Sequence, residues 1–397
     1  MTRLLPDRRM LLTGGGAALS MAFLSGCAGG PGRPAAPGMA AAGPVLKLPP
    51  LRTGIDHITQ ITVCTRPFRP QGPRIERERL GEKDVIHHYG HGGAGWSLSW
   101  GSAAVAVGLV MQTGARDIAV IGCGAIGLTT ALELQRAGAR VTIYAREMPP
   151  FVRSSFASGV WSPESRICLD MHATPAFKAQ WAAMARASYD RFQTLLGLPG
   201  TPIEWYDSFI VPMAGQTPRP PDPRPAFAHG LTRELTPELR SPRTTYAAGR
   251  HDFGDRDVRA DTGMMFNIAS YSHFLMSGFL ANGGRFEVRD FHSPAEFAGL
   301  AQKVLVNCTG YGARALFGDD TLVPVRGQLA RTMPQPDVTY GMYHDMVSFV
   351  PRRDGFVFQY VGADEYFGYG IDDPTPDRAE AERAVTTIAG LFAGGQV

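Results

Sequence analysis

A glycine-rich turn between two predicted β-strands constrains the fold of this chain more than any other feature. Residues 117–121 form a short apolar run with several β-branched side chains, and residues 122–127 have the sequence Gly-Cys-Gly-Ala-Ile-Gly. Residues 128–137 predict a helix that ends at Gly138, and residues 141–145 predict a second strand. This order of strand, Gly-x-Gly-x-x-Gly turn, helix and strand is typical of a Rossmann dinucleotide-binding unit.

Each glycine of this motif has a separate expected role. Gly122 permits the sharp turn, Gly124 lets the backbone approach a pyrophosphate, and Gly127 allows the helix to pack closely on the strand. The first helical N–H groups are free to bind the anion. An acidic residue usually ends the second strand and binds the ribose, but here that position is Ala145, followed by Arg146 and Glu147. The spacing alone therefore leaves both flavin and nicotinamide nucleotides open.

A second glycine-rich stretch lies upstream, at residues 85–103, and has four glycines among residues 90–95. Such a density after an apolar strand predicts a backbone that comes very close to a flat or anionic group, or that turns with positive φ. A metal site made of His87, His88 and His91 is the competing interpretation. It is disfavoured because these histidines alternate with loop glycines and no carboxylate flanks them, so no metal is expected.

Residues 85–103 resemble the signature of the D-amino acid oxidase family of flavoenzymes. Residues 66–71, Arg-Pro-Phe-Arg-Pro-Gln, resemble the family's Arg-Pro stretch, in which the first arginine binds the substrate carboxylate; that role falls on Arg66. A guanidinium suits it, because it stays charged and forms a planar two-point bond with a carboxylate. The resemblance implies an FAD cofactor, a Gly93 backbone facing the substrate amine, and His87 as a hydrogen-bond partner on the flavin side. A surface ion-pair strand explains residues 76–79 better than it explains Arg66.

Shorter resemblances continue downstream, at residues 144–145, 157–161, 304–310 and 326–328, the last expected as a loop. Trp161 is expected as a wall beside the flavin, although simple core packing could also explain Trp161 and Cys308. The predicted catalytic residues are Arg66, Gly93 and Trp161. The predicted FAD-binding residues are Gly122, Gly124, Ala125, Ile126, Gly127, Arg146, Glu147, Arg153, Ser154, Gly159, Thr309, Gly310, His87, Gly90, Gly92, Gly93, Gly95 and Trp96.

The order of these segments differs from the family, in which the Arg-Pro and glycine-rich stretches come last. The chain is therefore expected to be circularly permuted, with the region around Leu391 close to that around Asp56. The predicted fold is α/β: a Rossmann-like FAD domain with a parallel sheet, and an α+β substrate domain with a mixed or antiparallel sheet. Residues 51–115 are expected to be the permuted segment. The FAD domain is expected at residues 116–165 and 301–330, and mostly substrate domain at residues 166–300 and 331–397. A helix is expected at residues 377–392, and in the order of the family the strand at residues 58–63 would follow it.

The first 50 residues predict export. Arg8 and Arg9 precede a short apolar run, and residues 24–27 read Leu-Ser-Gly-Cys, so residues 1–27 resemble a twin-arginine signal with a lipoprotein cleavage site at Cys27. An ordinary cleaved signal is the alternative. Residues 28–50 are rich in Gly, Pro and Ala and predict a tether, which together implies a periplasmic, membrane-anchored lipoprotein.

The expected activity is oxidation of a D-amino acid to a 2-oxo acid and ammonia, with oxygen reduced to hydrogen peroxide. A dehydrogenase that passes electrons to a quinone, a glycine or sarcosine oxidase, and a flavin-binding lipoprotein without turnover are alternatives. Tyr246, Tyr271 and Tyr340 are candidates for the substrate lid. The net charge of +3 gives no indication of a nucleic-acid partner, and the five cysteines, without CxxC spacing, allow at most two disulfides.

Overall fold

The computed structural model describes residues 43–213 and 222–393. The predicted export signal, Cys27 and most of the predicted tether lie outside these residues. Residues 43–50 correct the end of the tether prediction, because Leu46 is buried and its N–H donates to the carbonyl of Arg250. The carbonyl of Pro49 accepts a hydrogen bond from the Tyr340 hydroxyl. Leucines among the prolines make this stretch part of the core, and no helix in the described ranges is long and apolar enough to cross a bilayer.

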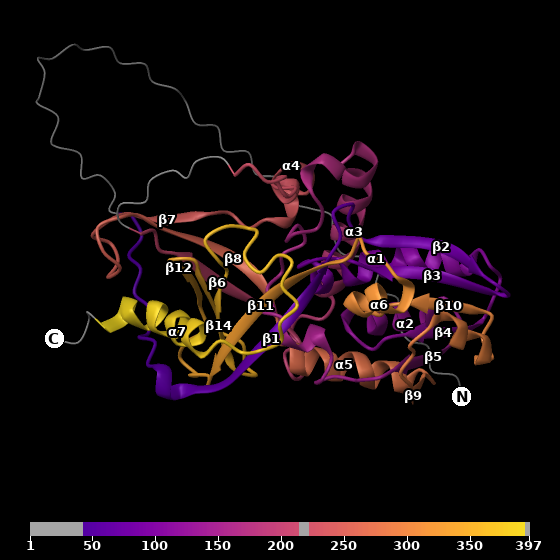
Figure 1. Ribbon diagram of the computed structural model, residues 1–397. Coiled ribbons are helices and arrows are strands. Elements are labelled where there is room, and N and C mark those ends of the chain that lie inside the picture. Colours follow the sequence, from indigo (N-terminus) through magenta and orange to yellow (C-terminus); the bar gives the residue numbers. More distant parts are fainter. Residues whose placement is uncertain (1–42, 214–221, 394–397) are drawn as a thin grey trace, which may run out of the picture. The chain divides into compact units, whose positions relative to one another are not determined.

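The nucleotide-type sheet has six strands, in the order β2-β3-β10-β4-β5-β9 (Figure 1). Five of them run parallel, and β2 pairs antiparallel at one edge. The turn between β4 and α2 lies between a strand and a helix, as the sequence predicts. The apolar run of β4 is buried in the sheet, and α2 packs against α1 and α5. The bounds are β2 Arg74–Leu80, β3 Lys83–Tyr89, β10 Val304–Asn307, β4 Asp117–Ile121, β5 Arg140–Ala145, β9 Arg285–Val288, α1 Gly95–Met111, α2 Ala125–Arg136, α3 Pro175–Gln193 and α5 Ile268–Ala281.

The larger sheet has eight strands, in the order β1-β11-β14-β13-β12-β6-β8-β7, and all neighbours are antiparallel except β12 and β6. A parallel-dominated sheet beside a mixed sheet confirms the predicted fold class. The bounds are β1 Ile58–Phe68, β11 Val323–Thr332, β14 Phe356–Tyr360, β13 Val347–Val350, β12 Gly341–His344, β6 Ile203–Ile210, β8 Val258–Phe266 and β7 Thr244–Tyr246, with helices α4 Leu231–Leu235, α6 Ala313–Phe317 and α7 Arg378–Ala393. Short 3-10 turns are η1 Ile55–His57, η2 Arg153–Phe156, η3 Asp170–His172, η4 Pro237–Leu239, η5 Pro294–Gly299 and η6 Gly310–Gly312.

The chain passes between the two sheets more often than the predicted domain boundaries allow. Residues 51–115 place β1 in the large sheet and β2, β3 and α1 with the small one, and residues 166–300 contribute β9 to the small sheet. Residues 326–328, predicted as a loop, lie inside β11, where Arg326 pairs with Thr65 of β1. Strand pairing between distant segments depends on tertiary packing, which a local pattern does not encode.

The start and the end of the described chain pack together on one side of the large sheet, where α7 contacts η1 and β1 (Figure 1). Leu51, Ile58 and Leu391 belong to one apolar cluster there, with Val385 and Ile388 fully buried in it. A circularly permuted chain is expected to have these two segments close together. The circular permutation itself stays a prediction, since proximity of two segments does not establish their history.

The edge strand β2 carries the ion pairs that its sequence predicts. Arg77 and Arg79 both pair with Asp84, at 2.9 and 3.1 Å, and Arg74 pairs with Glu76 and Glu78. Charged side chains on an exposed edge discourage pairing with a second sheet. The structural role of these residues separates them from Arg66, which lies in another sheet.

Candidate active site

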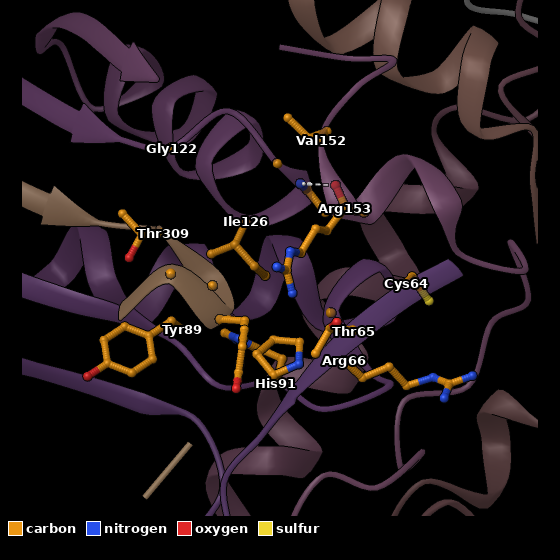
Figure 2. A pocket seen from close by; sticks show the side chains of 18 of the residues that line it. Cys64, Thr65, Arg66, Tyr89, His91, Gly122, Ile126, Val152, Arg153 and Thr309 are labelled. Atoms are coloured by element: carbon orange, nitrogen blue, oxygen red, sulfur yellow. Dashed lines mark hydrogen bonds between the residues drawn. The ribbon is translucent and has the colours of Figure 1, made fainter. Parts of the chain in front are cut away.

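A cavity of about 1010 Å³ is lined by residues of both sheets. One end is formed by the β4–α2 turn, the end of β5 and the segment after β10, and the other end by β1, β11 and β14. Figure 2 shows Gly122 and Thr309 toward one side of this cavity and Arg66 toward the other. Sixteen of the predicted site residues line it, namely Arg66, Gly90, Gly92, Gly93, Gly95, Trp96, Gly122, Gly124, Ala125, Ile126, Arg146, Glu147, Arg153, Ser154, Thr309 and Gly310.

The turn after β4 accepts only glycine at two positions. Gly122 has a φ of +109°, and a Cβ there would lie 2.5 Å from the carbonyl oxygen of Cys308. Gly127 does not line the cavity, because it lies beneath the turn, where a Cβ would be 2.1 Å from the carbonyl oxygen of Gly122. Both contacts are with backbone, which has no room to shift. The close packing of α2 on β4 is therefore built on these glycines.

The first turn of α2 is tied to the rest of the site through Ser154. Its hydroxyl oxygen accepts a hydrogen bond from the Ala125 N–H at 3.0 Å, and its carbonyl accepts one from the Trp96 indole at 2.8 Å. Ser154 thus joins α2, α1 and the turn at η2. Beside it the Arg153 guanidinium stacks on Tyr311, 5.2 Å from the ring centre, and lies 3.8 Å from Asp372.

The end of β5 offers acidic groups in place of the missing one at Ala145. Glu147 lines the cavity, and Asp290, two residues past the end of β9, lines it from the neighbouring segment. Arg146 lies 3.6 Å from Glu147 and 3.9 Å from Asp290. Two carboxylates therefore line this end of the cavity in place of the acidic residue that the motif normally supplies, one of them two positions after Ala145 and the other just after β9.

The histidines of β3 diverge. Consecutive strand residues point to opposite faces of a sheet, so His87 and His88 lie on different sides. His87 is a correction to the prediction: its ring nitrogens lie 2.8 Å from Glu78 and 3.2 Å from Asn307, and it does not line the cavity. Within the described ranges, no three His, Cys, Asp or Glu side chains are grouped as a metal site would need.

His88 and His91 line the cavity and are almost completely buried, with ring centres 5.2 Å apart. His88 Nδ1 lies 2.9 Å from the Thr130 hydroxyl, whereas its Nε2 and both ring nitrogens of His91 have no hydrogen-bond partner within the described chain. Burial lowers the pKa of His91 to about 3, and burial together with His91 lowers the pKa of His88 well below its usual range. Both imidazoles are therefore neutral at pH 7, and His91 presents a free donor and a free acceptor.

These depressed pKa values predict acid sensitivity. An unfolded histidine protonates near its ordinary pKa of 6.5, while folded His91 does so only near 3. The stabilisation is therefore complete above pH 6.5 and is lost as the pH falls from 6.5 toward 3, by about 1.4 kcal/mol per pH unit for each such histidine. The measurement is the free energy of unfolding of the holoenzyme in urea at pH 7, 6 and 5. In His91→Gln this free energy should decline less with falling pH, by the contribution of one histidine. Equal slopes for the native protein and His91→Gln would contradict the assignment.

Trp161 and Gly159 are also corrections, since neither lines the cavity. The Trp161 ring packs on Tyr189 and Phe192 with centres 5.6 Å apart, so core packing explains it. Gly159 has a φ of +86°, and a Cβ there would lie 2.5 Å from the carbonyl oxygen of Phe266, so it serves the contact of this loop with β8.

Arg66 lines the cavity from β1, and its side chain extends away from the side where Gly122 and Thr309 lie (Figure 2). Its Nη1 donates to the carbonyl of Arg326 at 3.3 Å, and no carboxylate of the described residues forms an ion pair with it. A Cβ at Gly327 would lie 2.5 Å from Nη2 of Arg66, so this glycine makes the room that the guanidinium occupies. A partly buried guanidinium without a counter-ion is suited to bind an anion that enters the cavity.

Arg166 is a cavity residue that the sequence does not single out. Its φ of 46° is in the left-handed region, which a non-glycine residue seldom adopts, and its Nε donates to the carbonyl of Glu365 at 2.8 Å. Burial, and then the nearby charge of Arg66, lower the pKa of Arg166 to about 10, so it remains charged at pH 7. An arginine in an irregular loop has no local pattern that marks it.

The predicted lid tyrosines lie elsewhere. Tyr271 is buried and accepts a hydrogen bond from the Trp100 indole at 2.7 Å, Tyr340 bonds to Pro49, and Tyr246 packs on Phe209. The cavity is lined instead by Tyr311 and Tyr360, among others. Aromatic residues are equally useful in a core, so their sequence positions did not separate the two uses.

The residues present fit FAD. The glycine turn and the segment at Thr309 and Gly310 provide backbone for a pyrophosphate, and His91 provides buried polar atoms without a partner. Arg153, Arg289 and Arg314 add positive charge along the same end of the cavity. Cys64, Cys123, Cys168 and Cys308 are buried free thiols, so no disulfide of the described chain shapes the site.

Comparisons with known proteins agree with this geometry. Residues 117–396 match the DAO family, described as FAD dependent oxidoreductase. The chain is similar to D-amino-acid oxidase of Dictyostelium discoideum, at 26% identity over 284 residues that cover 71% of this chain and 75% of the relative. A shorter stretch of 52 residues, 13% of this chain and 14% of the relative, is 51% identical to D-aspartate oxidase of Talaromyces thermophilus. Among solved structures, iminodiacetate oxidase from Chelativorans sp. BNC1 aligns with a TM-score of 0.47 at 16% identity, over 70% of this chain and 79% of that one.

The family match covers β4, the glycine turn and nearly all that follows them along the chain. The segment with Arg66 and the glycine-rich stretch precedes the match and lines the same cavity. The chain is therefore a member of the DAO family of FAD-dependent oxidoreductases.

Proposed function

We propose that this enzyme oxidises a D-amino acid to the 2-oxo acid and ammonia, with oxygen as acceptor and hydrogen peroxide as the second product. The observation that carries the proposal is the unpaired guanidinium of Arg66 in the cavity that the FAD-binding turn also lines. It is supported by the relatives, which are named for oxidation of D-amino acids and D-aspartate.

The chain's own residues bind and orient the substrate in this proposal. Arg66 holds the α-carboxylate by two parallel hydrogen bonds, which fixes the α-carbon relative to the glycine-rich wall. The Gly93 N–H is already donated to Ser165 at 2.9 Å, so its carbonyl is the polar atom left to accept from the substrate amine. FAD, held by the glycine turn and by the segment at Thr309 and Gly310, would supply the two-electron acceptor for the hydride of the α-carbon and would return the electrons to oxygen. The amine loses a proton, and water hydrolyses the imino acid to the 2-oxo acid and ammonia.

Two rival activities share this site. A quinone in place of oxygen would make the protein a dehydrogenase, and a substrate without a side chain would make it a glycine or sarcosine oxidase. The roles of Arg66 and the glycine-rich wall are the same in all three, so substrate and acceptor must be measured. A flavin-binding protein without turnover is disfavoured by the unpaired Arg66.

One experiment separates these possibilities. The purified protein is mixed anaerobically with D-alanine, D-aspartate, their L-forms, glycine and sarcosine, and the visible flavin absorbance is followed. We expect bleaching by a D-amino acid and not by its L-form, and peroxide release when air is admitted. Absence of bleaching with every amino acid would refute the proposal, and bleaching without peroxide would favour the quinone-linked alternative.

We also propose that the chain is exported and anchored through Cys27, on the grounds of Arg8, Arg9 and residues 24–27 alone. The protein should then fractionate with membranes, and Cys27→Ser should release it. An unchanged membrane fraction for Cys27→Ser would refute lipid anchoring at this residue.

A further inference from the structure

We propose that the substrates are acidic D-amino acids, in which Arg66 binds the α-carboxylate and Arg166 binds the carboxylate of the side chain. This inference rests on the proposed function and narrows it to one substrate class. It is carried by the position of the two arginines, which reach one end of the cavity from segments about 100 residues apart in the chain.

Gly92 brings these two segments together. Its N–H donates to the carbonyl of Pro67 at 2.9 Å, which fixes the residue next to Arg66. On its other side, a Cβ at Gly92 would lie 2.0 Å from the carbonyl oxygen of Arg166, so the backbones of residues 92 and 166 are in direct contact. The neighbouring Gly93 N–H donates to Ser165 at 2.9 Å. The backbones that carry Arg66 and Arg166 are thus held on two sides of one glycine.

The backbone of Arg166 is held in an unfavourable conformation. Its φ of 46° lies in the left-handed region, which is unfavourable for a residue with a Cβ. Such conformations persist where the surrounding structure imposes them, and they concentrate at binding sites. The contacts with Gly92 and Gly93 impose this one, and they leave the Arg166 side chain at the cavity.

Asp364 and Glu365 lie near enough to Arg166 to raise its pKa against the effect of burial, but neither forms an ion pair with Arg66 or Arg166. Asp364 pairs with Arg224 at 2.9 Å, and Glu365 pairs through its carboxylate with His229. Arg166 donates only through its Nε, to the backbone carbonyl of Glu365, and its other guanidinium nitrogens donate to no group of the described residues. Arg66 likewise makes a single bond to a backbone carbonyl. Two guanidiniums that repel each other are therefore left for ligands.

A ligand with two carboxylates gives each guanidinium an ion-pair partner, whereas a ligand with one carboxylate leaves one guanidinium without such a partner. The cavity wall next to the arginines also includes the polar residues Thr65, Ser162 and Gln359. An uncharged side chain would leave Arg166 desolvated and without a partner, which a binding site built for a polar group penalises strongly. D-aspartate and D-glutamate carry the second carboxylate, and D-asparagine is the isosteric neutral analogue of the former.

The test compares D-aspartate, D-asparagine and D-alanine in the holoenzyme and in Arg166→Leu, Arg166→Lys and Arg378→Leu. The last is a control on α7, where the arginine is exposed and pairs with Glu382. We expect the native enzyme to prefer D-aspartate over D-asparagine in kcat/KM by about 30-fold or more, as a desolvated charge pair implies. Arg166→Leu should abolish this preference in two ways: it should raise the KM for D-aspartate, and it should relieve the penalty that an unpaired Arg166 imposes on D-asparagine and D-alanine. Arg166→Lys should retain part of the preference, and Arg378→Leu all of it.

A binding measurement keeps the inference testable apart from turnover. Malonate, with two carboxylates, and acetate, with one, are titrated while the visible flavin spectrum is recorded. Malonate should bind the native enzyme more tightly than acetate, and Arg166→Leu should remove that difference. Turnover of D-alanine without a preference for D-aspartate, or a preference that survives Arg166→Leu, would overturn the inference alone. No flavin reduction by any D-amino acid would overturn the proposed function and this inference with it.

Discussion

Replacing Arg66 by alanine is expected to raise the apparent KM for the amino acid substrate strongly, by roughly 2–5 kcal/mol of lost binding, as for a desolvated charge pair. The reason is that Arg66 is the cavity guanidinium on β1 and forms no ion pair with a carboxylate of the described chain. Steady-state kinetics on the purified holoenzyme measure the change, and kcat should fall less than kcat/KM if the α-carboxylate is bound equally in the ground and transition states.

Two further variants serve as controls for the effect of Arg66→Ala on the KM. Arg66→Lys keeps the charge but loses the two-point geometry, so its KM should lie between those of the native enzyme and Arg66→Ala. Arg77→Ala removes an arginine of the β2 edge that pairs with Asp84 at 2.9 Å, and it should not change the KM. A native KM in Arg66→Ala would remove Arg66 from the substrate site, and with it the observation on which the proposed function rests.

Gly127→Ala is expected to abolish FAD binding, because one added carbon would lie 2.1 Å from the carbonyl oxygen of Gly122. Either α2 moves away from β4 or the turn changes shape, and both disturb the N–H groups that face the pyrophosphate. The measurement is the flavin content of the purified protein, from the ratio of visible to ultraviolet absorbance, together with the affinity of the apoprotein for added FAD.

Gly108→Ala is the matched control, since Gly108 is also a helical glycine, on α1, and a Cβ there would meet nothing within 4 Å. Alanine in an open helical position stabilises a protein by about 0.5–1 kcal/mol relative to glycine. Gly108→Ala should therefore bind FAD normally and unfold at a slightly higher temperature or urea concentration. If Gly127→Ala instead retained full FAD content, the close packing at Gly122 would not be a requirement of the site.

Local sequence patterns predicted the elements that make the nucleotide end of the site. The apolar run at residues 117–121, the glycines at 122, 124 and 127, and the run at 141–145 predicted β4, the turn and β5 with bounds within a few residues. These elements can be predicted because each depends on neighbouring residues in the sequence. A turn with positive φ needs glycine, and a buried parallel strand needs a continuous apolar run. The resemblance of residues 85–103 to the family added a second wall of the cavity, and the resemblance of residues 66–71 added Arg66.

The errors of prediction concern side chains whose neighbours are distant in sequence. His87 was expected beside the flavin, but the alternation of β3 turns it toward Glu78 and Asn307, and His88 and His91 line the cavity instead. Trp161 was expected as a wall and packs on α3. Choosing among adjacent histidines, or between core and wall for a tryptophan, requires knowledge of which face of the sheet is covered and by what.

The sequence by itself determined the glycine turn, the parallel unit around it and the family to which they point, because those features follow from backbone conformation and local hydrophobic pattern. Only the tertiary structure decided that β1 and β11 pair in the other sheet, and that Gly92 holds Pro67 and Arg166 on its two sides. The contacts of Gly92 join residues 25 and 74 positions apart, and the pairing of β1 with β11 joins residues about 260 positions apart. They depend on the free energy of packing the whole chain, which no local stretch contains, and they place two positive charges at one end of the cavity.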